Sequence, residues 1–143
     1  MRNYIFGLLL LVISDYSFSQ KIDSSEEKEI PSKIQTLDSI IEQDPTAYNY
    51  YLRGYLKYKI KKYPLALSDY NQAIELNPKE FDFYYSRGML KDKTNDFNGA
   101  VKDYTKCIGL NNDSDKSYFN RALSNTMMNN FKGALDDYSK CIE

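Results

Sequence analysis

The chain has 143 residues, of which 42% are hydrophobic and 15% aromatic, which suits one domain with a packed core but not two. Nineteen Lys and Arg residues against twenty Asp and Glu residues give a net charge of −1, which argues against binding to nucleic acid or anionic lipid through overall charge. The sequence has no histidine, which is the commonest general base and metal ligand in proteins. Most hydrolytic and zinc-dependent mechanisms would therefore lack their usual catalytic or metal-binding residue.

The N-terminus resembles a secretory signal. Arg2 precedes the apolar run YIFGLLLLVI, and Ser17 and Ser19 follow as small residues at the spacing that a signal peptidase requires. The run of about ten residues falls short of the roughly 20 that span a bilayer as a helix. We therefore predict a signal peptide over residues 1–19, cleaved before Gln20, with a retained membrane anchor as the alternative. The protein is then exported to the periplasm or secreted, with no stable membrane span after cleavage.

A polar segment and one amphipathic helix follow. Residues 20–30 have no apolar period and are predicted to form a disordered linker. We expect the first helix over residues 31–44, beginning at Pro31 and ending before Pro45. Its apolar residues fall on one stripe at helical spacing: Ile34, Leu37, Ile40 and Ile41.

The rest of the chain is a tandem repeat. The windows 47–80, 81–114 and 115–143 align without a gap, at a period of 34 residues. Within each window, helical spacing on both sides of a break, such as Tyr63-Pro64, predicts two helices. Seven columns are chemically consistent in all three windows: Tyr50, Tyr84 and Tyr118; Arg53, Arg87 and Arg121; Gly54, Gly88 and Ala122; Tyr63, Phe97 and Phe131; Ala66, Ala100 and Ala134; Asp69, Asp103 and Asp137; Tyr70, Tyr104 and Tyr138. The small column lets the two helix backbones of a repeat approach closely.

This unit resembles the tetratricopeptide repeat, a 34-residue helix-turn-helix with small residues and aromatics at fixed positions. The positions that carry the resemblance are Gly54, Ala66, Tyr70, Ala73 and Pro78 in repeat one, Gly88, Ala100, Tyr104 and Cys107 in repeat two, and Ala122, Ala134, Tyr138 and Cys141 in repeat three; Asn112 stands where repeat two should have the Pro. The resemblance implies an all-α fold, an α-solenoid of antiparallel helix pairs with three repeats, the last one short. The helix over residues 31–44 should cap the N-terminal end, since Ile41 precedes Ile74 by 33 residues, as a second helix would.

The resemblance also implies that the first helices line a concave groove that receives a peptide or a helix of a partner protein. The expected groove residues are Tyr48, Tyr51, Tyr55, Tyr58, Asp82, Tyr85, Met89, Asp92, Lys116, Phe119, Leu123 and Thr126. Tyr rings offer a large contact area at low entropic cost, which favours a ligand with apolar anchors. The alternative for Tyr51 and Tyr85 is packing between repeats.

Three further patterns have a structural and a functional interpretation. The Arg and Asp columns, 16 residues apart within each repeat, favour an ion pair between the two helices over an anion-binding ladder. The cluster KYKIKK, with Lys57, Lys59, Lys61 and Lys62, favours a solvated helix end over a phosphate or lipid site. Cys107 and Cys141, one repeat apart, lie too far from each other for a disulfide and should replace the small Ala73 as buried thiols.

These observations predict an exported protein–protein interaction scaffold. We expect no catalytic residue, no cofactor, no metal and no nucleic-acid partner, because no nucleophile–base pair, metal cluster or phosphate loop is visible. The alternative is a structural or assembly component that forms a homo-oligomer through its last repeat. That repeat stops just after Cys141, which should leave Leu135, Tyr138 and Ile142 without a covering helix.

Overall fold

The computed structural model describes residues 24–110 and 114–141. These residues form seven helices and no strand. The helices are α2 (Ser24–Gln43), α3 (Ala47–Lys59), α4 (Tyr63–Leu76), α5 (Phe81–Lys93), α6 (Phe97–Leu110), α7 (Asp115–Met127) and α8 (Phe131–Lys140). The predicted signal over residues 1–19 lies outside the described part of the chain. None of the described helices is long and apolar enough to cross a membrane.

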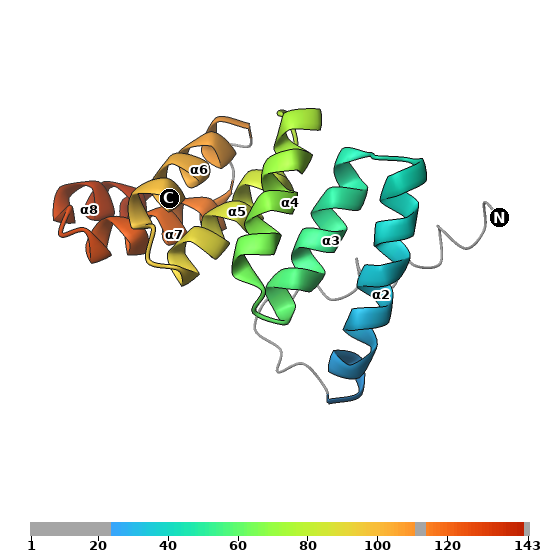
Figure 1. The fold of residues 1–143 in the computed structure, drawn as a ribbon. Helices are drawn as coiled ribbons and strands as arrows, with labels where there is room; N and C mark the ends of the chain where they lie inside the picture. The colour runs from blue at the N-terminus through green and yellow to red at the C-terminus, as the bar shows by residue number, and fades with distance from the viewer. Residues whose placement is uncertain (1–23, 111–113, 142–143) are drawn as a thin grey trace.

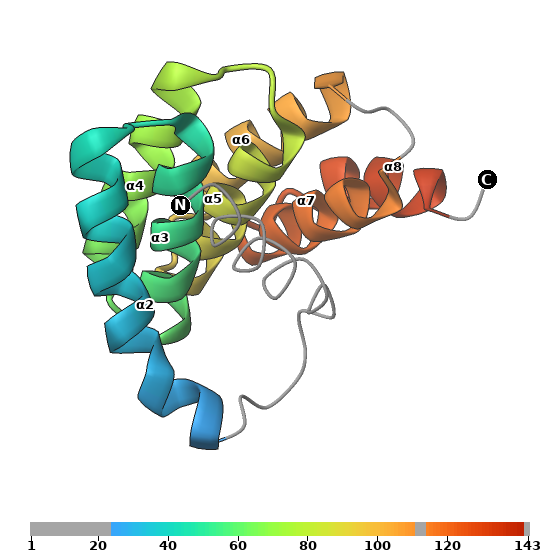
Figure 2. The ribbon, with the colours of Figure 1, turned by 90° about the vertical axis from the view of Figure 1, so that its right-hand side faces the viewer.

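The helices form three antiparallel hairpins that stack into one array. α3 pairs with α4, α5 with α6 and α7 with α8, and successive hairpins meet through α4 with α5 and α6 with α7. α2 packs on α3 at one end, and α8 lies at the other end (Figure 1). In the turned view, α7 and α8 run across the direction of α2 and α3, so the stack twists along its length (Figure 2). The predicted α-solenoid with an N-terminal capping helix is confirmed.

The capping helix begins earlier than the sequence predicted. α2 starts at Ser24 and contains Pro31 in its interior. The linker predicted over residues 20–30 is therefore wrong from Ser24 onward, where the chain is helical rather than disordered.

Packing explains this extension of α2. Ile30 is only 3% exposed and belongs to the apolar core. Lys33 forms an ion pair with Glu29 at 3.1 Å across Pro31, which has no backbone N–H to donate within the helix. Burial of Ile30 thus holds together a segment whose proline and polar composition both argued for a loop.

Each hairpin is closed by a close approach at the small column. A Cβ atom on Gly54 would lie 2.9 Å from Cδ1 of Tyr70, and one on Gly88 would lie 2.8 Å from Cε1 of Tyr104. Repeat three has Ala122 at this position, fully buried. The predicted contact between the small column and the second helix is confirmed, and it fixes how far apart the two helices of a repeat lie.

The turn inside each hairpin uses one left-handed residue. Lys61, Asn95 and Asn129 have φ angles of 60°, 64° and 58°, one in each repeat. Asn tolerates this region better than most residues because its side chain can bond locally, whereas Lys has no such compensation. Repeat one therefore carries a strained residue at a position where the other two repeats carry a suited one.

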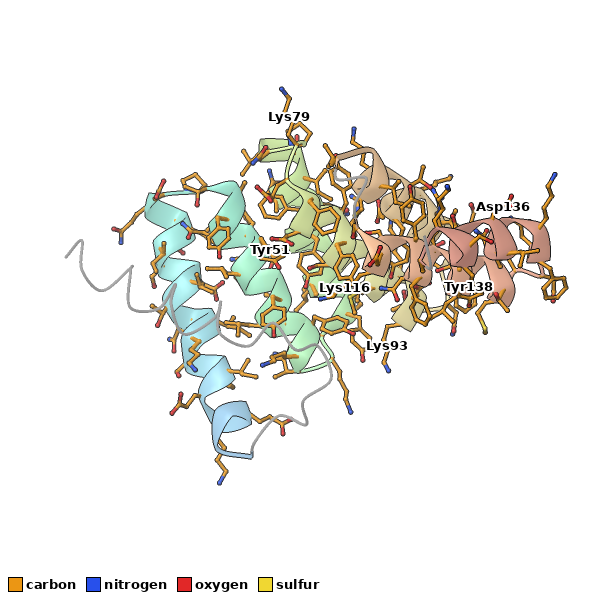
Figure 3. The ribbon with its side chains drawn as sticks, turned by 180° about the vertical axis from the view of Figure 1, so that it is seen from behind. Tyr51, Lys79, Lys93, Lys116, Asp136 and Tyr138 are labelled. Atoms are coloured by element: carbon orange, nitrogen blue, oxygen red, sulfur yellow. The ribbon has the colours of Figure 1, made fainter. Side chains whose placement is uncertain are left out.

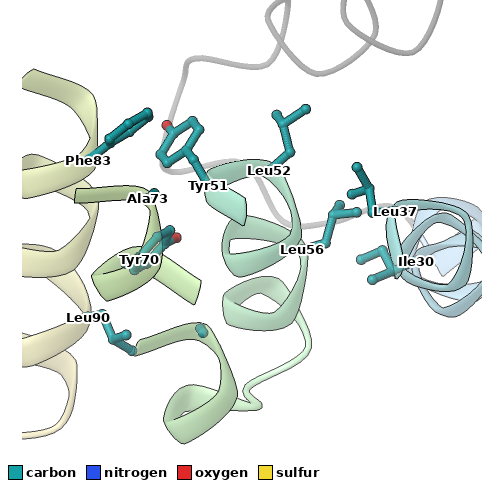
Figure 4. Close-up of a cluster of buried hydrophobic side chains, with 10 residues drawn as sticks. Ile30, Leu37, Tyr51, Leu52, Leu56, Tyr70, Ala73, Phe83 and Leu90 are labelled. Carbon is teal, nitrogen blue, oxygen red and sulfur yellow. The ribbon is translucent and has the colours of Figure 1, made fainter. Parts of the chain in front are cut away.

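The largest core cluster joins the cap to the first two repeats. Leu37 of α2 lies toward Leu52 and Leu56 of α3, and on the other side of α3 the rings of Tyr51 and Phe83 meet (Figure 4). The members of this cluster are Ile30, Leu37, Tyr51, Leu52, Leu56, Ala66, Tyr70, Ala73, Phe83 and Leu90. One continuous core thus spans three structural units, as expected when a single hairpin cannot bury both of its faces.

Candidate functional site on the first helices

The predicted groove residues lie on α3, α5 and α7, and they differ widely in exposure. Tyr51 is buried, whereas seven others are partly buried: Tyr48, Tyr55, Tyr58, Asp82, Tyr85, Met89 and Asp92. The four residues of α7 are exposed: Lys116, Phe119, Leu123 and Thr126. We call the eleven residues other than Tyr51 the first-helix face. In Figure 3, Tyr51, Lys93 and Lys116 mark α3, α5 and α7.

Tyr51 belongs to the core rather than to the first-helix face. It is 8% exposed, and its ring centroid lies 6.0 Å from that of Tyr70 and 5.0 Å from that of Phe83. Its hydroxyl accepts a hydrogen bond from Ser86 Oγ of the next repeat at 3.4 Å. The structure therefore favours packing between repeats, the alternative stated for this residue.

Tyr85 combines partial exposure with a structural role. Its ring stacks on Phe81 at 5.7 Å and meets Tyr104 at 6.0 Å. Its hydroxyl accepts a hydrogen bond from Asn120 Nδ2 of repeat three at 2.9 Å. Burial raises the pKa of this hydroxyl. Tyr85 thus remains partly exposed on the first-helix face while it joins repeats two and three.

Asp92 is also occupied by contacts within the protein. One carboxylate oxygen accepts a hydrogen bond from Ser124 Oγ at 2.6 Å, and the other accepts one from the Tyr104 hydroxyl at 2.8 Å. Burial raises the pKa of this carboxyl, and the two hydrogen bonds act in the opposite direction. Asp92 is therefore a link between repeats rather than a free acidic ligand for a partner.

The tyrosines of α3 form the most aromatic part of the face. Lys59 Nζ lies 5.4 Å from the ring centroid of Tyr55, and the rings of Tyr58 and Tyr63 lie 5.7 Å apart. The pKa of Tyr48 is raised, first by burial and then by the negative charges of Asp82 and Glu80. The α3 end of the first-helix face is thus aromatic. Its Tyr rings contact neighbouring side chains, and Asp82 and Glu80 lie near Tyr48.

The predicted ion pair between the helices is confirmed in all three repeats. In each pair, Arg Nε and Nη2 donate hydrogen bonds to the two carboxylate oxygens of the Asp on the second helix. The two distances are 3.0 and 2.6 Å for Arg53 with Asp69. They are 2.9 and 2.7 Å for Arg87 with Asp103. Repeat three has the same pair, between Arg121 and Asp137. These groups are paired inside the repeats, which argues against an anion-binding ladder.

Sequence reasoning missed the second cation on this carboxylate. Lys57 Nζ lies 2.7 Å from Asp69, and Lys91 Nζ lies 2.8 Å from Asp103. Repeat three has Asn125 in this column, whose Nδ2 donates to Asp137 at 3.4 Å. The signal was available in the sequence, because this column lies four residues after the Arg on the same face of the first helix. Lys57 of the KYKIKK cluster is therefore an internal partner rather than a free cation.

The two cysteines are not joined. Both are free thiols, as expected, and Cys107 is buried as predicted. The predicted burial is wrong for Cys141, which is partly exposed because it follows α8, a helix on which only α7 packs among the described elements. Burial raises the pKa of Cys107 to about 12, so its thiolate is scarce near neutral pH. Among residues 24–110 and 114–141, no group of three or more His, Cys, Asp or Glu side chains is arranged to hold a metal ion.

Two family models match parts of the chain. One, described as TPR repeat, matches residues 54–91, and the other, described as tetratricopeptide repeat, matches residues 81–114. Residues 54–114 are therefore similar to tetratricopeptide repeats, and the described chain has a helical-solenoid fold like that of these repeats. No curated protein sequence matches the chain.

Solved structures with this fold include several of MamA. A crystal structure of MamA superposes with a TM-score of 0.77 and 23% identity, covering 79% of this chain and 67% of that chain. MamA 41-end from Desulfovibrio magneticus RS-1 gives a TM-score of 0.74 and 19% identity, covering 82% of this chain and 67% of that chain. A third MamA structure, at 23% identity, is covered over 62% of its length. The chain thus spans about two thirds of these proteins, and at this identity the likeness shows the fold alone.

Proposed function

We propose that this chain is a protein–protein interaction scaffold that binds a peptide or helix of a partner on its first-helix face. The observation that carries the proposal is that three successive first helices leave large apolar or aromatic side chains partly uncovered. These are Tyr48, Tyr55 and Tyr58 on α3, Met89 on α5, and Phe119 and Leu123 on α7. The side chains would act by contact rather than by chemistry, so the proposed role is not catalytic.

The aromatic end of the face is partly ordered before any ligand arrives. Tyr55 is covered on one side by Lys59, and Tyr58 by the ring of Tyr63. Side chains that already occupy one arrangement lose less conformational entropy on binding, and Tyr rings bury a large area with few rotatable bonds. These features support apolar anchoring of a partner segment at repeat one.

Charge near the anchor residues favours a particular partner chemistry. Asp82 and Glu80 lie close enough to Tyr48 for their charges to raise its pKa, after the larger effect of burial. Asp82 forms no ion pair among those found in the described residues. A partner segment that places a Lys or Arg beside its apolar anchor would fit this edge.

The test is the binding of peptides selected from a phage-displayed library on the wild-type chain. Tyr55→Ala and Met89→Ala should each weaken binding of a selected peptide by about 1–2 kcal/mol, roughly 5- to 30-fold, as moderate anchors do. Leu65→Ala is the matched control, because Leu65 is 51% exposed on the second helix α4 and should leave affinity unchanged. Equal affinity in folded Tyr55 and Met89 variants would exclude this face as the site.

We also propose that the protein is exported, in the periplasm or outside the cell, because residues 1–19 have the charge, apolar run and small residues of a secretory signal. N-terminal sequencing of the protein from its own host should then begin at Gln20. A chain that retains Met1 or Arg2 at its N-terminus would contradict cleavage.

A further inference from the structure

The first-helix face has opposite charges at its two edges in repeats one and two. Asp82 lies in the first turn of α5, and Lys93 lies in its last turn. The two residues are eleven positions apart, about three helical turns, so both lie on the side of α5 that also holds Met89. In Figure 3, Lys79, which precedes α5, and Lys93, its last residue, lie at opposite sides of the molecule.

The acidic edge consists of Glu80 and Asp82. Both side chains are partly buried, and their negative charges raise the pKa of Tyr48, after the larger effect of burial. Neither residue forms an ion pair among those found in the described residues, and Glu80 makes no side-chain hydrogen bond at the start of α5. Within the described part of the chain, the charge of this edge therefore has no ion-pair partner.

The basic edge consists of Lys59 and Lys93. The last turns of α3 and α5 hold four lysines, and the other two, Lys57 and Lys91, are bound to carboxylates inside their repeats. Lys59 Nζ lies 5.4 Å from the ring centroid of Tyr55, and Lys93 is exposed. The ion pairs found among residues 24–110 and 114–141 include neither member of the basic edge. Two cations thus stand beside the apolar centre of the first-helix face.

This charge pattern is not a general requirement of the repeat. A cation in the last turn of a helix suits the helix dipole and needs no ligand to explain it. In repeat three, however, Lys116 stands in the column of Asp82, and Met127 stands in the column of Lys93. α7 therefore has a cation at the first edge and an apolar side chain at the second. The opposite charges of the two edges are a feature of repeats one and two alone.

The distance between the two edges fits one α-helix. Eleven residues of α5 span about 16 Å along its axis, and an α-helix with its side chains is about 10–12 Å wide. A helix that crosses α3 and α5 over Tyr55 and Met89 places one flank beside each edge. A single extended strand occupies only about 5 Å in this direction, so it leaves one edge without a partner.

We propose that the partner segment is an amphipathic helix that crosses repeats one and two, with Asp or Glu on the flank beside the basic edge and Lys or Arg on the flank beside the acidic edge. This inference rests on the proposed binding at the first-helix face. The apolar stripe of the helix packs on Tyr55 and Met89, in the way that helices with anchors at i, i+3, i+4 and i+7 bind to apolar surfaces.

The spacing of the two lysines sets the spacing of the acidic residues on the partner. α3 and α5 contact each other, so their axes lie about 8–10 Å apart where they pack. Two residues seven positions apart on a helix lie on the same side and are separated by about 10 Å. Asp or Glu at positions i and i+7 of the partner helix can therefore meet Lys59 and Lys93 at the same time.

The two charged edges also fix the direction of the bound helix. Turning the helix end for end, with its apolar stripe kept on the face, exchanges its two flanks. A helix with one acidic and one basic flank thus pairs opposite charges in one direction along the array and brings like charges together in the other. Charges at the rim of an interface contribute to specificity in this way more than to affinity.

The first experiment uses peptides selected on the full chain whose binding is weakened by Tyr55→Ala. These peptides should carry acidic and basic residues on opposite flanks of one apolar stripe. At low ionic strength, Lys93→Glu should weaken their binding about 5-fold, the effect of one exposed ion pair. Changing the acidic flank of the peptide to Lys should restore binding to this variant. Lys102→Glu is the matched control, because Lys102 is exposed on the second helix α6 and should leave affinity unchanged.

The acidic edge is tested in the same way with Asp82→Asn, which removes the charge but keeps the size of the side chain. Binding should weaken, and the loss should disappear when the basic flank of the peptide is changed to Gln. Glu75→Gln is its control, because Glu75 is exposed on the second helix α4. Circular dichroism should show equal helicity in all four variants.

The outcomes separate this inference from the proposed function. Peptides that depend on Tyr55 but bind Lys93→Glu and Asp82→Asn as tightly as the wild type overturn the charged flanks and leave the proposed function standing. An equal loss in Lys102→Glu also overturns them, because the effect is then one of overall charge. A selection that yields no peptide dependent on Tyr55 overturns both proposals.

A photo-cross-linking group at the N-terminus of a selected peptide tests the direction of the helix. Exchanging the acidic and basic flank residues of the peptide should move the cross-link from one end of the array to the other, between α3 and α7, while affinity changes by less than about 2-fold. A cross-link that stays on the same helix for both peptides overturns the fixed direction.

Discussion

Arg87 holds the carboxylate of Asp103 through two parallel hydrogen bonds, and its third nitrogen, Nη1, donates to Asn71 Oδ1 of the preceding repeat at 2.7 Å. One guanidinium thus joins three helices, α5, α6 and α4. The same arrangement recurs at Arg53, which reaches Asp38 on α2, and at Arg121, which reaches Thr105 on α6. The planar fork of Arg suits this role, because its nitrogens point to different partners at once.

The first prediction is that Arg87 and Asp103 are energetically coupled. Arg87→Ala should destabilise the fold by about 1–3 kcal/mol, because the nearly buried Asp103 loses its bidentate hydrogen bonds while Lys91 still pairs with it. The double variant with Asp103→Ala should lose less than the sum of the two single losses, by about 0.5–3 kcal/mol. Urea denaturation of the four proteins measures this difference, and strict additivity would contradict the coupling.

Lys91 provides a control for this cycle. Its Nζ lies 2.8 Å from Asp103 Oδ2, so it should partly replace Arg87 as the counter-charge when Arg87 is removed. Repeating the cycle with Lys91→Asn, the residue type that repeat three has at Asn125, should therefore increase the coupling between Arg87 and Asp103. An unchanged coupling would show that Lys91 does not share the carboxylate in solution.

The second prediction concerns the contact between Gly88 and Tyr104. Gly88→Leu should destabilise the fold by at least about 1–3 kcal/mol, because even a Cβ atom there would lie 2.8 Å from a fully buried ring. Gly109→Leu is the matched control. Gly109 lies on the exposed side of α6, where a Cβ atom would have no neighbour within 4 Å, so stability should be unchanged or slightly higher. Equal thermal unfolding of the two variants would exclude Gly88 as an interhelix contact.

The repeat pattern explains how much of the fold the sequence could predict. Matching columns such as Arg87 with Asp103 combine information from three copies, and each column has one structural role, so the helix pairs and their ion pairs could be derived. α2 has no such copies. Its start depended on the burial of Ile30, a single apolar residue within a polar segment, and that signal was outweighed by Pro31.

The candidate site was harder to predict, because it depends on the differences between repeats. The repeat alignment places Tyr51, Tyr85 and Phe119 at equivalent positions. Tyr51 is nevertheless 8% exposed and Phe119 is 49% exposed. The difference arises from the repeat that follows. Phe83 of repeat two packs on Tyr51, whereas no described repeat follows Phe119. Helical spacing predicts the direction in which a side chain points but not which residues pack on it. The exposure of these side chains therefore could not be predicted from the sequence.

The third prediction separates the two thiols. Cys141 should react with iodoacetamide in the native protein, whereas Cys107 should react only after unfolding, because it is fully buried and its pKa is raised to about 12. Mass spectrometry of digested protein after timed labelling at pH 7 measures both rates. In the unfolded protein, iodoacetamide should label two thiols per chain even when no reductant is added. Native labelling of Cys107 at the rate of Cys141 would contradict the packing of α6.

The last prediction concerns the strained turn of repeat one. Lys61 has a φ angle of 60°, whereas the matching residues, Asn95 and Asn129, are of a type that tolerates this region. Lys61→Asn should therefore stabilise the protein by about 0.5–1 kcal/mol, since a left-handed conformation costs an ordinary residue about 1–2 kcal/mol.

Two variants check this origin of the effect. Asn95→Lys should destabilise by a similar amount, because it places the unsuited residue at the matching turn of repeat two. Lys79→Asn removes the same charge from an exposed turn outside the left-handed residues of the described chain, so the midpoint of thermal unfolding should not move. If Lys79→Asn stabilised the protein as much as Lys61→Asn, the gain would come from the lost positive charge, and the conformational explanation would be wrong.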